Sequence, residues 1–65
     1  MNVIVNGTPH TPQAATLAAL LRELGYDDAS VATARNRAFV RRKDRATTQL
    51  ADGDEIEILT PRQGG

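Results

Sequence analysis

Residues 1–6, with the sequence MNVIVN, alternate between the two sides of an extended chain. One side is purely apolar and carries Met1, Val3 and Val5. Ile4 lies on the other side, between two asparagines. This period of two is typical of a strand that is buried on one face. Asn6-Gly7 follows and favours a tight hairpin turn, so we predict a hairpin whose second strand covers residues 8–11.

The spacing of apolar residues then changes to that of a helix. Leucines recur at positions 17, 20, 21 and 24 and form one apolar stripe on a helical surface. Thr16 is the predicted N-cap, and Thr11 followed by Pro12 is an alternative helix start. Gly25 suits the left-handed conformation that ends a helix. A helix of about two turns is unstable alone in water, so it must dock on the sheet.

The second half of the chain predicts three more short strands. Two cover residues 31–35 and 38–40 and are joined by a turn at Asn36-Arg37. Residues 41–49 are expected to be irregular or to form a single helical turn, with Leu50 as their apolar anchor. After a turn at residues 52–54, the last strand covers residues 55–59, with its two isoleucines facing the core and its two glutamates facing solvent.

These elements predict a single sheet with one helix packed across it. The first and last strands are expected to be central and parallel, because a long crossover separates them. The predicted fold class is α+β, a ubiquitin-like β-grasp with a mixed sheet of four to five strands, one helix and a flexible C-terminal tail. Residues 1–60 form the predicted β-grasp domain, and residues 61–65 form the predicted flexible Gly-Gly tail.

Length and composition narrow the class of protein. A chain of 65 residues supports one domain with a thin core and leaves little room for a buried catalytic cavity. It contains no cysteine, whereas small secreted domains usually carry disulfides, so we expect a cytoplasmic protein. No targeting segment is visible, and no apolar run approaches the roughly 20 residues that span a bilayer, so no membrane partner is expected.

Charged residues are segregated, although the formal net charge is zero. The basic stretch consists of Arg35, Arg37, Arg41, Arg42, Lys43 and Arg45. Clustered arginines suit a phosphate backbone, but only Phe39 lies among them to stack on bases. A solvated face is therefore the simpler interpretation, and no nucleic-acid partner is expected.

The acidic residues are Asp52, Asp54, Glu55 and Glu57. They predict a solvated turn and strand face, with a docking surface as the alternative.

The chain offers few of the residues that enzymes use for covalent catalysis. It has no cysteine, one serine (Ser30) and one histidine (His10). This set does not supply a nucleophile, a base and an orienting group, and a lone histidine without clustered ligands does not make a metal site. No glycine-rich phosphate loop occurs either. We therefore predict no catalytic residue, no metal and no cofactor bound by this chain.

The C-terminal sequence PRQGG is the remaining candidate site. Gly64 and Gly65 have no side chain with which to stabilise a fold. Pro61 stops the last strand, and a short linker then carries the terminal carboxylate away from the domain. A Cβ atom would widen this arm in a narrow channel and restrict its backbone. The predicted reactive group is the Gly65 carboxylate, with access provided by Gly64 and Gln63.

At these residues the chain resembles the ThiS family, the sulfur carrier proteins of thiamine biosynthesis. The matching segments are VNG at residues 5–7, TLAALLRELG at 16–25, VATARN at 31–36 and LADGDEIEIL at 50–59, followed by the terminal QGG. The resemblance covers nearly the whole chain, and the last motif is the most specific. The chain departs from the family at Arg41, where proline is common, and at Pro61-Arg62, where small or apolar residues are common.

The resemblance implies a carrier and not an enzyme. An E1-like adenylating enzyme would use MgATP to adenylate the Gly65 carboxylate, and the acyl adenylate would be converted to a thiocarboxylate. The sulfur would come from cysteine through a cysteine desulfurase, directly or by a relay. Thiazole synthase would then take this sulfur to form the thiazole. This chain would be a co-substrate of the adenylating enzyme and of thiazole synthase.

Three other functions stay open at the level of the sequence. The small subunit of molybdopterin synthase shares the fold, the Gly-Gly end and the thiocarboxylate chemistry, but is usually longer. A protein modifier would be conjugated to lysine through Gly65. A small RNA-binding β-grasp module would use the basic stretch from Arg35 to Arg45.

Partner docking is predicted at six residues, namely Ile4, Leu59, Arg41, Arg42, Asp52 and Asp54. Ile4 and Leu59 fall on the outer side of neighbouring strands and could form an exposed apolar patch, which on a small monomer often marks an interaction site. Cover by Phe39 or by arginine stems is the alternative.

Overall fold

Eight short elements make up the part of the chain that the computed structural model describes, residues 1–61. With η denoting a 3₁₀ helix, they are β1 (Val3–Val5), β2 (Thr8–His10), α1 (Leu17–Glu23), η1 (Asp28–Ser30), β3 (Ala32–Arg35), β4 (Ala38–Val40), η2 (Arg42–Thr47) and β5 (Glu55–Leu59). The predicted order of strands around one α-helix is confirmed, and η1 is an additional element.

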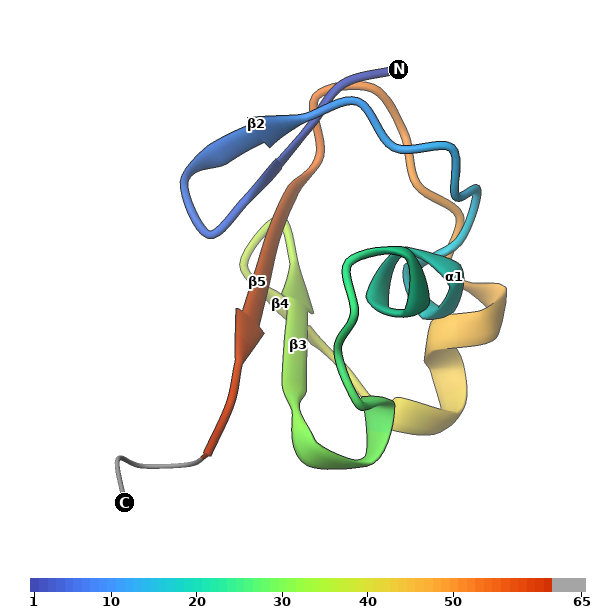
Figure 1. Ribbon diagram of the computed structural model, residues 1–65, viewed down its shortest axis with the longest axis vertical. Coiled ribbons are helices and arrows are strands. Elements are labelled where there is room, and N and C mark those ends of the chain that lie inside the picture. Colours follow the sequence, from blue (N-terminus) through green and yellow to red (C-terminus); the bar gives the residue numbers. More distant parts are fainter. Residues whose placement is uncertain (62–65) are drawn as a thin grey trace.

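The five strands form one mixed sheet in the order β2-β1-β5-β3-β4. β1 and β5 are parallel, whereas the other neighbouring pairs are antiparallel. Figure 1 shows α1 and η2 on the same side of the sheet, and within residues 1–61 no helix covers the other side. The predicted β-grasp, with the first and last strands adjacent and parallel, is confirmed.

The β1–β2 hairpin turns at Asn6-Gly7, as the sequence predicts. Both residues have positive φ, 51° and 84°, which a type I′ turn requires at its two central positions. Asparagine and glycine are the residues that adopt this conformation most readily. Val5 and Thr8 pair directly across the turn. The turn therefore leads β1 away from β5 immediately after Val5.

Helix α1 begins at the predicted cap. The Thr16 hydroxyl accepts a hydrogen bond from the Ala19 N–H at 3.2 Å, which satisfies one of the free donors at the helix start. The alternative start at Thr11 is wrong, because α1 begins only at Leu17. Gly25 follows the helix with φ of 86°, as a left-handed C-terminal cap.

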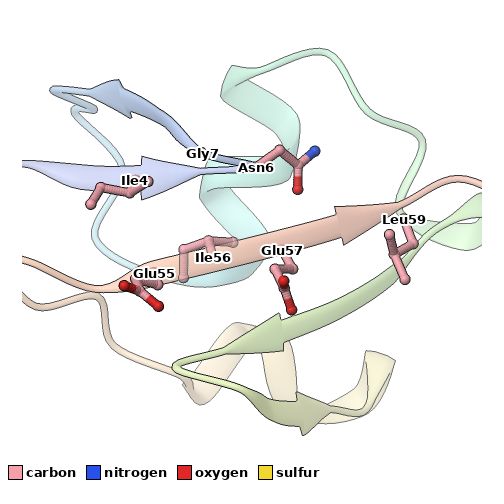
Figure 2. Close-up of a pocket in the computed structure, with 7 residues that line it drawn as sticks. All are labelled: Ile4, Asn6, Gly7, Glu55, Ile56, Glu57 and Leu59. Carbon is pink, nitrogen blue, oxygen red and sulfur yellow. The ribbon is translucent and has the colours of Figure 1, made fainter.

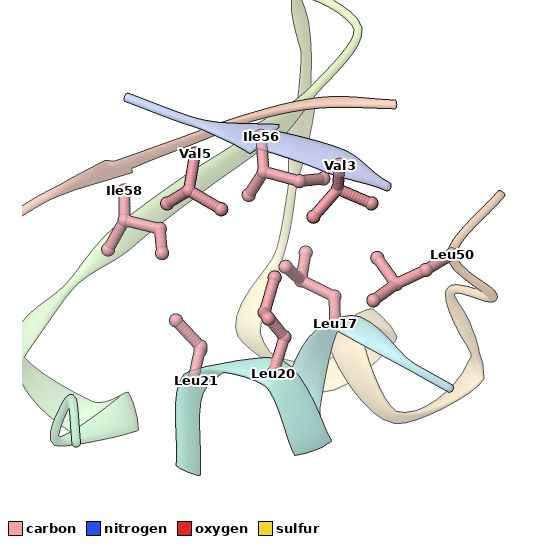
Figure 3. Close-up of a cluster of buried hydrophobic side chains, with 8 residues drawn as sticks. All are labelled: Val3, Val5, Leu17, Leu20, Leu21, Leu50, Ile56 and Ile58. Carbon is pink, nitrogen blue, oxygen red and sulfur yellow. The ribbon is translucent and has the colours of Figure 1, made fainter. Parts of the chain in front are cut away.

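The core lies between the sheet and α1 (Figure 3). It consists of aliphatic side chains from β1, α1, β5 and the segment before β5, namely Val3, Val5, Leu17, Leu20, Leu21, Leu50, Ile56 and Ile58. The inward orientation of the β5 isoleucines and the anchoring role of Leu50 are both confirmed. Each of these side chains is at most 9% exposed, so the sheet buries the inner side chains of β1 and β5.

Arg45 corrects the sequence interpretation of the basic stretch. Residues 42–47 form a 3₁₀ helix, which agrees with the helical alternative and not with an irregular segment, and Arg45 is only 3% exposed. Its guanidinium donates to the carbonyl oxygens of Asp28 and Val31 at 2.7 and 2.8 Å and to the Thr33 hydroxyl at 3.0 Å. The expectation of a fully solvated basic face is therefore wrong at Arg45, which joins η1, β3 and η2.

Candidate functional site

Strand β5 is the element that leads to the predicted reactive carboxylate. It lies in the middle of the sheet between β1 and β3, and Figure 1 shows it running along the length of the molecule. The predicted site residues Gly65, Gly64 and Gln63 lie outside the described residues, as does Arg62. The structure therefore describes the domain that precedes the tail, and the description ends at Pro61.

Asn6 contacts the C-terminal half of β5. The Ile58 N–H donates to Asn6 Oδ1 at 2.9 Å, and Asn6 Nδ2 donates to the Ile58 carbonyl at 3.1 Å. The Asn6 backbone N–H also donates to the Ile56 carbonyl at 2.9 Å. Sequence reasoning identified Asn6 as a turn residue and missed these contacts, because Asn6 and Ile58 are 52 residues apart.

The start of β5 is fixed by Asp54. Its carboxylate accepts from Arg35 Nε at 2.7 Å, from Asn36 Nδ2 at 3.0 Å and from the Ala51 N–H at 2.8 Å. Burial acts to raise the pKa of Asp54, but these three donors outweigh burial and hold the pKa below its ordinary value of 3.8. Asp54 is 5% exposed. The expectation that it belongs to a solvated face or to a docking surface is therefore wrong.

The outer face of the sheet carries an open groove along β1 and β5 (Figure 2). Ile4 and Leu59 lie on it, with the exposed carboxylates of Glu55 and Glu57 between them. Ile4 is 37% exposed and Leu59 is 65% exposed. Ile4 lies beside Glu55, four residues before Leu59, so the two apolar side chains are at opposite ends of the groove and do not form one continuous patch. Asn6 and Gly7 of the hairpin turn also line this groove. We call the surface formed by Ile4, Leu59, Glu55 and Glu57 the outer groove, and Asn6 borders it.

Phe39 does not cover this groove. It is 69% exposed and borders a second, smaller hollow of about 70 Å³ together with Leu59. Phe39 is paired with Ala34 across β3 and β4, and Ala32 is paired with Leu59. Exposed apolar side chains therefore extend from the outer groove towards the β4 edge of the sheet.

The other predicted docking residues lie elsewhere. Arg41 and Arg42 are exposed where β4 leads into η2, and they form ion pairs with Asp44 at 3.3 Å and Asp28 at 3.5 Å. Asp52 is exposed in the turn before β5, and its carboxylate accepts from the Asn2 N–H at 2.7 Å. Ile4 and Leu59 thus border the same groove, whereas the basic and acidic candidates do not lie on that surface.

The described residues include little else that resembles a reaction centre. The Ser30 hydroxyl donates to Asp27 at 2.9 Å. The Ala29 N–H and then Ser30 hold the pKa of Asp27 below its ordinary value. Within residues 1–61 no three acidic or histidine side chains gather into a metal-binding group. No helix in that part of the chain has the length and apolar character needed to cross a membrane.

Comparison with known proteins places the chain in a family. A model of the ThiS family matches residues 2–65, which is nearly the whole chain. The chain belongs to the ThiS family. The resemblance inferred from the sequence motifs is thereby confirmed, and the ThiS match includes the terminal Gly-Gly that the fold alone does not explain.

Two solved structures of thiamine biosynthesis proteins share the fold. The crystal structure of a thiamine biosynthesis protein, ThiS, from Geobacter metallireducens is 32% identical, with each chain covered completely and a TM-score of 0.82. An NMR solution structure of a thiamine biosynthesis protein from the same organism is 33% identical, with a TM-score of 0.79, over all of this chain and 88% of the other.

Two curated relatives are much longer than this chain. The thiazole synthases of Paramagnetospirillum magneticum and Magnetococcus marinus are each 38% identical over 66 residues, which cover 100% of this chain. The chain spans 20% of the length of each relative. Each of these two proteins therefore contains a segment similar to this chain, and the rest of its polypeptide is longer than that segment.

Proposed function

We propose that this ThiS-family chain is a sulfur carrier protein that donates sulfur for thiazole formation in thiamine biosynthesis. The observation that carries the proposal is the family match over residues 2–65, which joins a β-grasp domain to a C-terminal Gly-Gly. The central position of β5 supports it, because the carboxylate follows the strand that is paired on both sides. The chain acts as a co-substrate and supplies no catalytic group.

The first proposed step is adenylation of the Gly65 carboxylate by an E1-like adenylating enzyme. A carboxylate oxygen forms a bond to the α-phosphorus of ATP, and pyrophosphate leaves with the electrons of the broken phosphoanhydride bond. Mg²⁺ and ATP belong to the partner enzyme, where the metal stabilises phosphate charge. Gly64 leaves room around the reacting carboxylate, because it has no Cβ.

The second proposed step replaces AMP by sulfur. A sulfur nucleophile attacks the acyl carbon, a carbon–sulfur bond forms, and AMP leaves with the electrons of the carbon–oxygen bond. When the nucleophile is a persulfide, a thiolate then cleaves the sulfur–sulfur bond and leaves a thiocarboxylate on Gly65. The sulfur comes from cysteine through a desulfurase, directly or by a relay.

Thiazole synthase is the proposed acceptor of this sulfur. The two thiazole synthases that match this chain support the assignment, because each contains a ThiS-like segment within its own polypeptide. Linking two partners in one chain raises their effective concentration for one another.

The outer groove is the proposed docking surface. Ile4 and Leu59 present apolar area, and Glu57 adds negative charge beside it, whereas the Glu55 carboxylate forms an exposed ion pair with Arg37 at 3.6 Å. A partner surface with apolar side chains flanked by lysine or arginine would complement this arrangement. Arg41, Arg42 and Asp52 stay predictions as further contacts, at a distance from the groove.

Intact-mass measurement tests the carrier function. The chain is incubated with ATP, a sulfur donor and an adenylating enzyme of proven activity, and its mass should rise by the difference between sulfur and oxygen, located on Gly65. A chain that lacks Gly65 is the control and should not gain this mass, while its circular dichroism should match that of the full chain. Absence of a mass gain in the full chain would contradict the proposal.

Supplying the sulfurated chain to purified acceptors distinguishes the pathway. Loss of sulfur to thiazole synthase with formation of a thiazole phosphate supports the thiamine assignment. Loss of sulfur to the large subunit of molybdopterin synthase instead would assign the chain to molybdopterin formation. An adduct of Gly65 on a lysine side chain would identify a protein modifier.

An RNA-binding function receives less support from the structure. Arg45 is buried, and Arg35 is bound to the buried Asp54. Arg41 and Arg42 are already paired with aspartates. Retention on RNA that is lost in an Arg41→Ala, Arg42→Ala double variant, and kept when Gly65 is deleted, would nevertheless favour that function.

A further inference from the structure

Asn6 lies where β5 loses its backbone partner on one side. The parallel pairing of β1 and β5 consists of Ile4 with Glu55 and Val5 with Ile56, and the hairpin then leads the chain away. β5 continues to Leu59. Without another partner, the N–H and C=O groups of Ile58 on the β1 side would have no protein hydrogen bond, and that part of the strand would be less restrained.

The side chain of Asn6 replaces the missing strand. An asparagine amide carries the same donor and acceptor as a peptide group, and Asn6 uses both on Ile58, at 3.1 and 2.9 Å. The positive φ of Asn6, 51°, belongs to the same residue that turns the hairpin. Asn6 therefore ends β1 and also continues the hydrogen bonding of β5, on the side that faces β1, as far as Ile58.

Ile58 lies opposite Thr33 of β3, but its own N–H and C=O both face the β1 side and bond to Asn6. Asn6 therefore supplies the hydrogen bonds of both of these groups. Gly65 follows Ile58 by only seven residues. Because a chain spans at most about 3.5 Å per residue, the position of Ile58 limits how far from the domain the carboxylate can reach.

We propose that Asn6 is a positioning residue for the adenylation of Gly65, and that it acts by fixing the direction in which the chain leaves β5. This inference rests on the proposed carrier function, because it concerns the same reaction. In that reaction, the carboxylate oxygen bonds to the α-phosphorus of ATP and pyrophosphate leaves. A strand end that is already ordered loses less conformational entropy when the tail enters the enzyme, so a larger fraction of complexes places the carboxylate correctly.

Asn36 offers a matched control. It also has φ of 51°, and it also bonds β5 through its side chain, accepting from the Glu55 N–H at 2.9 Å and donating to Asp54 at 3.0 Å. Asn36 contacts the start of β5, whereas Asn6 contacts its end. Glycine at either position keeps the left-handed backbone and removes the side-chain bonds.

The experiment compares the Asn6→Gly and Asn36→Gly variants with the unaltered chain. The rate of pyrophosphate release by an adenylating enzyme of proven activity is measured as a function of carrier concentration. The temperature is kept below the thermal unfolding range of both variants. We expect Asn6→Gly to lower kcat about tenfold relative to Asn36→Gly with KM changed less than twofold, because misplacement reduces productive complexes. Asn6→Asp, which keeps the acceptor for the Ile58 N–H, should fall between Asn6→Gly and the unaltered chain.

A second measurement reports on the strand end without any enzyme. NMR order parameters of the Ile58 and Thr60 amides should fall in Asn6→Gly and stay unchanged in Asn36→Gly. Equal kcat values for the two glycine variants, or unchanged order parameters in Asn6→Gly, would overturn the positioning role. An increase in KM alone would also overturn it, because that result would make Asn6 part of the docking surface.

Failure of the carrier function gives a different result. In that case the unaltered chain itself releases no pyrophosphate with the active enzyme. Failure of the Asn6 inference leaves the unaltered chain active and the two glycine variants alike. The two failures are therefore separated by the unaltered chain.

Discussion

Ile58 and Leu59 are neighbours in β5, yet one belongs to the core and the other to the exposed outer face of the sheet. Ile58 is 3% exposed and lies in the core, whereas Leu59 is 65% exposed and lies in the outer groove. The alternation of a strand produces this difference within one residue. The inner face of the sheet is bound to α1 and maintains the fold, and the outer face is available to partners.

Ile58→Ala should give the largest loss of stability. Removal of three buried carbons leaves a cavity beside α1, and we expect the free energy of unfolding to fall by about 2–5 kcal/mol. A domain of this size has little stability to spare. Urea denaturation followed by circular dichroism measures the change. A loss below that of an exposed substitution would contradict the assignment of Ile58 to the core.

Arg45→Leu should be the next most destabilising change. It removes the donors for two partly buried carbonyl groups and for the buried Thr33 hydroxyl, and we expect a loss of about 3 kcal/mol. Arg42→Leu is the control, because its ion pair with Asp28 is exposed, and it should change stability by about 0–1 kcal/mol. Equal losses in the two variants would show that burial of Arg45 is unimportant.

Asp54→Asn should have a moderate effect that depends on pH. The pKa of Asp54 is lowered in the folded protein, so its charged form adds stability above the pKa of the unfolded chain, and this contribution is lost as the pH falls through the folded pKa. At neutral pH we expect a loss of about 1.5–3 kcal/mol, because hydrogen bonds to a charged group are replaced. The difference in stability between the variant and the unaltered chain should become smaller in acid. Thermal unfolding at a series of pH values from neutral to about 2 measures this change. A constant difference would contradict the role of the charge.

The β-strands and α1 could be predicted because apolar periodicity is a local property of the sequence. The hairpin at Asn6-Gly7 and the cap at Thr16 followed from residue types with defined backbone preferences. The roles of Arg45 and Asp54 could not be predicted, since their partners are remote in the sequence and charged residues are usually exposed. The same holds for the contact between Asn6 and Ile58. Gly65 was predicted from its sequence context alone.

Leu59→Ala should have the smallest effect on stability and a distinct effect on function. Its side chain is mostly exposed, so we expect the free energy of unfolding to change by less than about 0.5 kcal/mol. The outer groove loses apolar area that a partner would cover, so KM for adenylation should rise about tenfold while kcat is retained, because a few apolar contacts dominate binding at such surfaces.

This result would be the reverse of that expected for Asn6→Gly, where kcat falls and KM is retained. Phe39→Ala is the control on the same face, because Phe39 is equally exposed but lies beyond the groove. A similar rise in KM in both variants would extend the docking surface to β4. An unchanged KM in Leu59→Ala would remove the groove from the interface, while Gly65 would keep its proposed role, because docking and adenylation depend on different residues of the chain.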